Sequence, residues 1–190
     1  MLKACWDCVT GSGALRDGGD NEVSYGTQLN GDSQRVPLRT GERNMFVLPR
    51  AVNDGDSITV SGTFNNPERF TVNLLTGYTS PDYNNIACQL EANFPSPSNS
   101  TNGIILRMID NGQTEVINGT YMNHDVASLM TGSTFEITFK FETGNRGDTL
   151  SIFVKNSILE EFILKHQFDQ ISFLELRGDA NVNGLAFQFA

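Results

Sequence analysis

Polar side chains recur at every second position of a short apolar stretch in the middle of the chain. Gln89, Glu91 and Asn93 alternate with apolar residues there, so a strand through this stretch would present all three on one face. The apolar run 104–109 follows and contains a cation, Arg107. Carboxylate, amide and guanidinium groups can bind hydroxyl groups through hydrogen bonds of defined geometry. Two adjacent strands carrying these residues would form a polar groove.

The same alternation predicts which side chains of the first stretch face the core. Ile86, Cys88 and Leu90 would point inward, whereas Ala87 would share the outer face with Gln89. One face of the strand is then core and the other is a surface open to a ligand.

A plainer interpretation of the polar residues stays open. The three polar strand residues can be ordinary solvent-facing side chains, with Arg107 and Glu91 forming a surface ion pair. Such a pair contributes about 0 to 1 kcal/mol to stability. Asn73 and Glu175 on flanking strands could extend a groove, and polarity of an exposed face explains them better.

Other side chains give no sign of a catalytic or metal site. Cys5 and Cys8 have the spacing of a redox or zinc motif, yet no second such pair follows, and Cys88 makes the number of cysteines odd. His124 and His166 have no Ser or Cys partner in a recognisable motif, and no phosphate-binding glycine loop occurs. We therefore expect a non-catalytic protein with free thiols and with neither a metal nor a cofactor.

The charge balance excludes some partners. The chain has 190 residues, and 13 Lys and Arg against 22 Asp and Glu give it a net charge of −9, which repels nucleic acid. No run approaches the roughly 20 apolar residues of a membrane span. The first residues lack the apolar core of a signal peptide. We expect a cytoplasmic protein, with secretion without a signal peptide as the alternative.

Short strands separated by turn residues account for most of the chain. We count about ten from residue 46 onward, and no segment of 10 or more residues keeps a helical period without turn residues. The fold class predicted is all-β, an antiparallel β-sandwich or jelly roll of two sheets. Residues 1–44 read as an N-terminal extension that could add an edge strand, and residues 45–190 read as the sandwich domain. The segment 78–85 reads as a loop, and 122–131 reads as a connection with a short helical turn.

From residue 46 to the end, the order of these pieces resembles the galectin carbohydrate-recognition domain. The resemblance implies two packed antiparallel sheets of five and six strands, the concave one of which holds a β-galactoside. The matching pieces are Leu48-Pro49, DSITVSG at 56–62, ERFTVNL at 68–74, Ile86-Ala87, GSTFEI at 132–137 and ISFLELRGD at 171–179.

The sugar-binding motif of that family is replaced in this chain. Galectins use a His-x-Asn-Pro-Arg stretch, an Asn on the next strand, and then a Trp followed by a Glu. In the first motif, Gln89 stands in the place of the His, Glu91 of the Asn, Ala92 of the Pro and Asn93 of the Arg. Arg107 stands in the place of the Asn on the next strand.

The third element of the motif has no aromatic residue. Residues 114–116 take the place of the Trp, and Glu115 is the carboxylate near it. A lectin with a millimolar dissociation constant holds its ligand with about 4 kcal/mol, and each hydrogen bond removed costs about 1 to 3 kcal/mol. We therefore expect lactose binding to be weak or absent.

The sequence favours a lectin with altered glycan specificity. Its ligand-binding residues would be Gln89, Glu91, Asn93, Arg107 and Glu115. The alternative is a galectin-related module that has lost sugar binding and binds a protein partner instead. The oligomeric state stays open.

Overall fold

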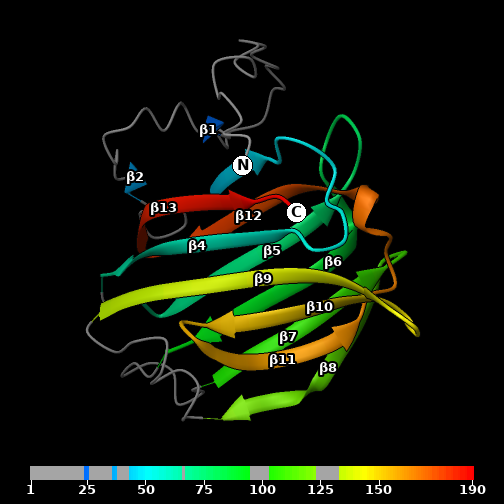
Figure 1. The fold of residues 1–190 in the computed structure, drawn as a ribbon. Helices are drawn as coiled ribbons and strands as arrows, with labels where there is room; N and C mark the ends of the chain where they lie inside the picture. Colours follow the sequence, from blue (N-terminus) through cyan, green and yellow to red (C-terminus); the bar gives the residue numbers. More distant parts are fainter. Residues whose placement is uncertain (1–23, 26–35, 38–42, 66, 95–102, 123–132) are drawn as a thin grey trace.

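The chain folds as two β-sheets packed face to face (Figure 1). The computed structural model describes residues 24–25, 36–37, 43–65, 67–94, 103–122 and 133–190. These residues form thirteen strands and one short 3₁₀ turn, Phe168–Gln170, and they contain no α-helix. The predicted all-β sandwich is therefore confirmed.

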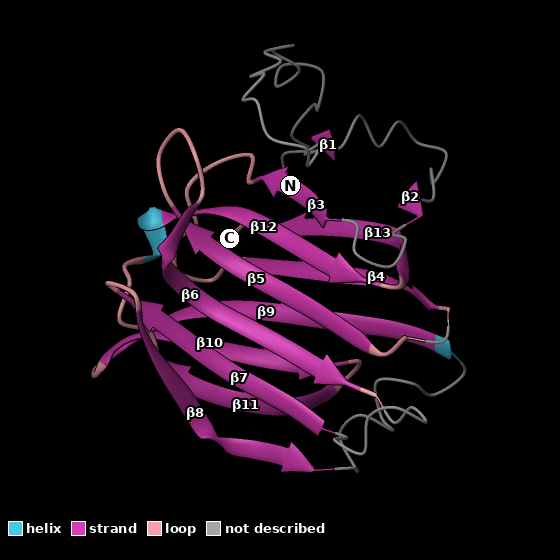
Figure 2. Ribbon diagram, turned by 180° about the vertical axis from the view of Figure 1, so that it is seen from behind, coloured by secondary structure: helices cyan, strands magenta, loops and turns pink. Residues whose placement is uncertain are grey.

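The seven-stranded sheet is the one that carries the polar residues singled out above, and Figure 2 shows it in front. Its strands pair in the order β1, β3, β12, β5, β6, β7 and β8. Every pairing is antiparallel except that of β1 with β3. Their bounds, in the order of the sheet, are Ser24–Tyr25, Arg43–Val47, Ile171–Gly178, Arg69–Thr76, Asp82–Asn93, Gly103–Asp110 and Gln113–Met122.

The six-stranded sheet covers one face of the first sheet. Its strands pair antiparallel in the order β11, β10, β9, β4, β13 and β2. Their bounds in that order are Ser157–Ile163, Gly147–Val154, Thr134–Gly144, Ser57–Phe64, Ala180–Gln188 and Val36–Pro37.

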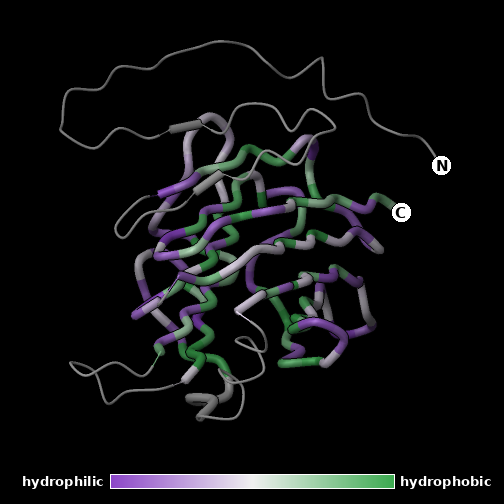
Figure 3. Tube along the Cα trace, turned by 90° about the vertical axis from the view of Figure 1, so that its left-hand side faces the viewer, coloured by the Kyte–Doolittle hydropathy of each residue, from purple (hydrophilic) through white to green (hydrophobic). Residues whose placement is uncertain are grey.

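The main core lies between the two sheets. Strand β4 shows how this core is formed, because every second residue of the strand is buried between the sheets and the residues between them are partly exposed. Figure 3 shows the same alternation of hydrophobic and hydrophilic positions along the strands. Four rings, Phe64, Phe70, Phe94 and Phe135, meet at one end of this core, with centroids of contacting rings 4.6 to 5.2 Å apart. Edge-to-face and stacked contacts of this kind add stability beyond the burial of area.

Strand β6 departs from the simple alternation that the sequence predicts. Cys88 pairs with Leu74 in the main core, as expected, but Ile86 pairs with Leu75 on the opposite face. Ala87 is buried in the main core, so the predicted sides of Ile86 and Ala87 are both wrong. The cause is a β-bulge, in which an extra residue reverses the faces of the residues that precede it.

A second, smaller apolar cluster lies on the face of the seven-stranded sheet that is turned away from the six-stranded sheet. We call this face the outer face. Met45, Leu75, Ile86 and Phe173 are buried in this cluster, and Ile109 packs against it. One end of the outer face is therefore apolar, and the rest is available for the polar residues.

The N-terminal region contributes a short piece to each sheet. Strand β1 pairs with β3, and β2 pairs with β13. Strand β3 begins at Arg43, two residues before the predicted start of the domain. The predicted loop 78–85 is only partly a loop, because β6 begins at Asp82.

Several sequence expectations fall outside the described residues. They are residues 123–131 of the predicted connection, with the helical turn and His124, and the pair Cys5 and Cys8. The first residue of that connection, Met122, is the last residue of β8. Cys88 is a buried free thiol, and burial raises its pKa well above the ordinary value.

Candidate functional site

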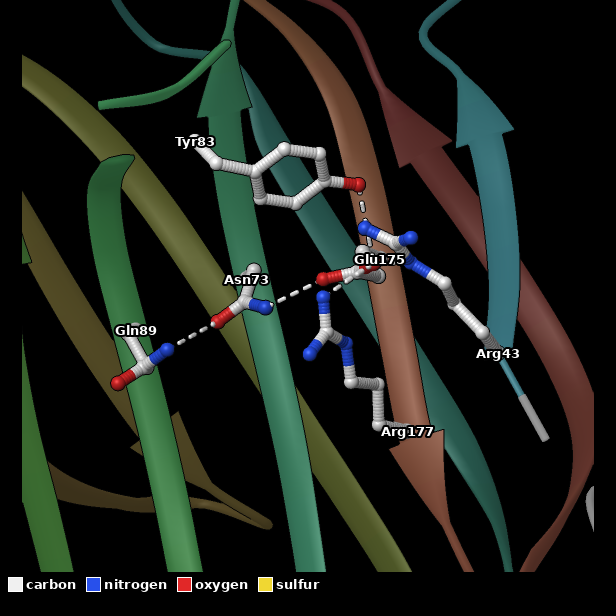
Figure 4. Close-up of polar contacts among 6 residues, drawn as sticks. All are labelled: Arg43, Asn73, Tyr83, Gln89, Glu175 and Arg177. Atoms are coloured by element: carbon white, nitrogen blue, oxygen red, sulfur yellow. Dashed lines mark hydrogen bonds and ion pairs between the residues drawn. The ribbon is translucent and has the colours of Figure 1, made fainter. Parts of the chain in front are cut away.

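Four polar side chains form a continuous row across the outer face. Arg107, Gln89, Asn73 and Glu175 lie at paired positions of β7, β6, β5 and β12. Arg107 Nη1 donates to Gln89 Oε1 at 3.1 Å, and Gln89 Nε2 donates to Asn73 Oδ1 at 3.1 Å. Asn73 Nδ2 then donates to Glu175 Oε2 at 2.5 Å (Figure 4). We call this row the polar ladder.

Glu175 ends the polar ladder and has no exposed surface. Its Oε1 accepts hydrogen bonds from Arg43 Nε, from Arg177 Nη2 at 3.0 Å and from the Tyr83 hydroxyl at 3.2 Å. Figure 4 shows these three side chains converging on the carboxylate from β3, β12 and β6. A buried charge is tolerated only with such partners, so Glu175 ties β3 and the start of β6 to the middle of the sheet.

Glu91 holds Arg107 from a second side. Arg107 Nη1 donates to Glu91 Oε2 at 3.2 Å, and Asn93 Nδ2 donates to Glu91 Oε1 at 3.0 Å. Burial acts to raise the pKa of Glu91, but the bond from Asn93, the charge and bond of Arg107 and the charge of Arg69 outweigh it and lower that pKa. Glu91 is therefore a carboxylate at neutral pH, with its partners already in place.

A shallow hollow lies beside the polar ladder. It has a volume of about 310 Å³ and lies over β12, β5 and β6, where Arg177, Thr71 and Glu91 occupy paired positions. That volume is at the lower end of small-molecule sites, which range from roughly 300 to 1,000 Å³. The other lining residues are Glu68, Arg69, Gln89, Gly178 and Asp179.

Gly178 shapes the rim of this hollow, where β12 turns toward β13. Its φ is +116°, and a Cβ at this position would lie 2.2 Å from the backbone oxygen of Arg69. A side chain is therefore excluded by both conformation and space.

The structure brings together four of the five residues predicted as ligand-binding. Gln89, Glu91, Asn93 and Arg107 contact one another on the outer face. Glu115 does not join them. It pairs with Met108, a residue of the main core, and forms an ion pair with Lys165. Its position on β8 directs it to the other face of the sheet.

The structure also adds residues that the sequence analysis did not assign to the site. Asn73 and Glu175 were interpreted as exposed, which is wrong because both are buried. Arg43 lies in the predicted extension, and Tyr83 lies in the predicted loop. One signal could have found Glu175, since a lone carboxylate within the apolar run ISFLEL needs a partner if that strand is buried. The partners themselves depend on strand register and on the bulge in β6.

The described residues show no grouping of three or more His, Cys, Asp or Glu side chains that could hold a metal ion. Within the same residues, the chain has no helix with the length and apolar character that crossing a membrane requires.

Comparison with known proteins identifies the family. The sequence model of the galactoside-binding lectin family matches residues 44–187 of this chain. The chain therefore belongs to the galectin family, and its sandwich is a galectin-like carbohydrate-binding domain. Members of this family generally act as lectins rather than as enzymes. A search of curated proteins gives no match.

Solved structures of galectins share the fold at low sequence identity. Sheep galectin-11, in complex with glycerol, is 13% identical with a TM-score of 0.59, over 80% of this chain and 99% of that one. The galectin LEC-6 of Caenorhabditis elegans is 14% identical with a TM-score of 0.58, over 80% and 94%. The homodimeric chicken liver agglutinin CG-16 is 16% identical with a TM-score of 0.55, over 77% and 100%. At these identities the likeness concerns the fold alone.

Removing the charge of Glu175 should destabilise the sheet. We expect Glu175→Gln to lower the free energy of unfolding by about 1.5 to 3 kcal/mol, because hydrogen bonds to a charged group are lost. The cost should stay below that of breaking a fully buried pair, since 31% of the Arg43 side chain and 47% of the Arg177 side chain are exposed and can be hydrated. Urea denaturation measures the change.

Glu142→Gln is the matched control. It removes a carboxylate from an exposed pair with Lys140, which should cost less than about 1 kcal/mol. Equal, small effects of the two substitutions would contradict the role given to Glu175.

Glu91 should titrate below its ordinary pKa of 4.5. A group with a lowered folded-state pKa contributes stability above its unfolded-state pKa, and this contribution is lost as the pH falls through the folded-state pKa. We expect the stabilising contribution of the Glu91 carboxylate, through its bonds with Asn93 and Arg107, to be present at neutral pH and to be lost in acid below pH 4.5. Carboxyl-carbon NMR titration gives the midpoint, and Asn93→Ala should raise it. A midpoint at or above 4.5 in the unmodified protein would refute this assignment.

Proposed function

We propose that this protein binds a glycan on the outer face of the seven-stranded sheet, without catalysis and with weak or no affinity for lactose. The observation that carries the proposal is the mutual hydrogen bonding of Arg107, Gln89, Glu91 and Asn93. Side chains held in place before binding lose little conformational freedom when a ligand arrives. A fixed set of amide, carboxylate and guanidinium groups suits the hydroxyls of a sugar.

Arg107 has donors left for a ligand. Both of its bonds to described residues use Nη1, so Nε and Nη2 remain for hydroxyl oxygens. Its side chain is 23% exposed, which leaves these donors reachable from solvent. Glu91 fixes the direction of the guanidinium, and geometry would then contribute to selectivity.

The altered specificity is supported by what stands beside Arg107. Val116 of β8 pairs with Arg107, and this half-exposed side chain is aliphatic. A galactose lying there would have no aromatic ring beneath its apolar face. The loss of the ring and of the replaced motif residues together costs more than the roughly 4 kcal/mol that is the total binding free energy of a lectin with a millimolar dissociation constant.

The second candidate function is binding of a protein partner, and an observation on the other sheet favours it. Strand β11 is an edge of the six-stranded sheet, and its Ile158 and Ile163 are exposed. An edge strand with exposed apolar side chains can accept a strand from a partner.

For location, we propose the cytoplasm, with secretion without a signal peptide as the alternative. The buried thiol of Cys88 supports a reducing compartment.

A broad glycan array that includes lactose separates the two functions. We expect binding to at least one glycan with a dissociation constant of about millimolar or tighter, together with lactose binding at background. A clear lactose isotherm in calorimetry would contradict the altered specificity. Silence across the whole array would contradict glycan binding itself.

Arg107→Ala tests the site. Loss of its hydrogen bonds should weaken glycan binding by about 1 to 3 kcal/mol, roughly 5- to 150-fold. Stability should fall by about 1 to 3 kcal/mol, because Glu91 and Gln89 lose a partner in a mostly buried position, and thermal unfolding checks that the variant is folded under the conditions of the binding assay. Gln89→Ala serves as the neighbouring variant, and Lys140→Ala on the other sheet serves as the remote control. Unchanged affinity in both Arg107→Ala and Gln89→Ala would move the binding surface away from this face.

A further inference from the structure

Strand β6 contains three extra residues at its start. On β5, Thr76 pairs with Asp82, and the adjacent Leu75 pairs with Ile86. Residues 83–85 therefore bulge out of the register between the two strands. Bulges of this kind redirect a side chain at the edge of a sheet or beside a site.

The bulge is held by its own set of hydrogen bonds. The Asp82 carboxylate accepts from the backbone N–H of Asn84 at 2.9 Å and from Asn85 Nδ2 at 2.8 Å. The backbone N–H of Asn111 donates to Asn85 Oδ1 at 2.9 Å, and that of Gly112 donates to the Asn84 carbonyl at 2.8 Å. The bonds from Asn85 and Asn84 also lower the pKa of Asp82. The bulge is thus a fixed structure, anchored to the turn between β7 and β8.

Tyr83 is the side chain that this bulge lays across the outer face. Its hydroxyl donates to Glu175, and its ring centroid is 4.6 Å from Arg43 Cζ and 5.9 Å from Arg177 Cζ (Figure 4). The residue remains 39% exposed. The hydroxyl bond and the guanidinium groups over the ring fix the orientation of Tyr83, and the part of the ring that they leave uncovered is an apolar surface open to solvent.

We propose that Tyr83 is the aromatic platform for the glycan, an inference that rests on the proposed function. The apolar C–H face of a pyranose would lie on the exposed ring. The hydroxyls of the sugar would accept hydrogen bonds from those guanidinium nitrogens of Arg43 and Arg177 that do not bond Glu175. Both side chains are partly exposed. The centre of the site then shifts from β7 and β8, where Val116 offers no ring, to β12 and β5.

The hollow beside Arg177 has room for a second sugar unit. Arg177 both lines the hollow and approaches the Tyr83 ring, so the two surfaces are adjacent. A sugar unit over Tyr83 would have a neighbour in the hollow, between Arg177 and Glu91. A glycan of two or more sugar units would therefore contact both surfaces, with one ring stacked and the next held by hydrogen bonds.

Four variants on the same glycan array test this inference. Tyr83→Ala should lose roughly tenfold in apparent affinity for every glycan that the unmodified protein binds, because the stacking surface is gone. Tyr83→Phe keeps the ring and should retain most of the binding. Tyr83→Leu keeps a smaller apolar side chain without an aromatic face and should resemble Tyr83→Ala. Tyr78→Ala is the matched control, since Tyr78 lies on the preceding loop and is 93% exposed.

Thermal unfolding of each variant shows whether a loss of binding reflects a loss of fold, and Tyr83→Phe nearly preserves the packing volume. Unchanged affinity in Tyr83→Ala and Tyr83→Leu would overturn the inference. So would a loss in Tyr83→Phe as large as in Tyr83→Ala, because the hydroxyl contact with Glu175 would then be what matters. If Arg107→Ala weakens binding and the Tyr83 variants do not, this inference alone falls. If the unmodified protein binds no glycan, the proposed function falls and takes this inference with it.

Discussion

The buried carboxylate of Glu175 is the constraint on which the outer face depends. A charge with no exposed surface must be surrounded by donors, and here those donors come from β3, β5, β6 and β12. Asn73 in turn accepts a hydrogen bond from Gln89, and Gln89 accepts one from Arg107, so both side chains are held in a defined orientation. One buried charge therefore orients side chains across five strands of the sheet.

A change of specificity in this fold would require replacement of side chains on one face of a sheet and would leave the core beneath it intact. The two sheets and the core between them are those of a galectin domain. On the outer face of this chain, amides, carboxylates and guanidinium groups pair with one another. The proposed binding function would reside in this surface, while the apolar residues beneath it maintain the fold.

Regular periodicity explains what could be predicted from the sequence. The alternation along β4 and β9 has a period of two, and it predicts the strands and their buried faces directly. It also places Gln89, Glu91 and Asn93 on one face. The bulges in β6 break the period, so Ile86 and Ala87 reverse and Tyr83 arrives on the outer face. Long-range partners such as Arg43 and Glu175 depend on which strands become neighbours, and a local pattern does not contain that information.

Chemical-shift mapping by NMR, with the glycan that binds most tightly on the array, tests the central claim most directly. The account predicts that the backbone amides perturbed on titration lie in β5, β6, β7 and β12, around Asn73, Gln89, Arg107 and Glu175. Perturbations confined to β9, β10 and β11 of the six-stranded sheet would contradict it, because the glycan would then bind on the opposite side of the sandwich from the polar ladder.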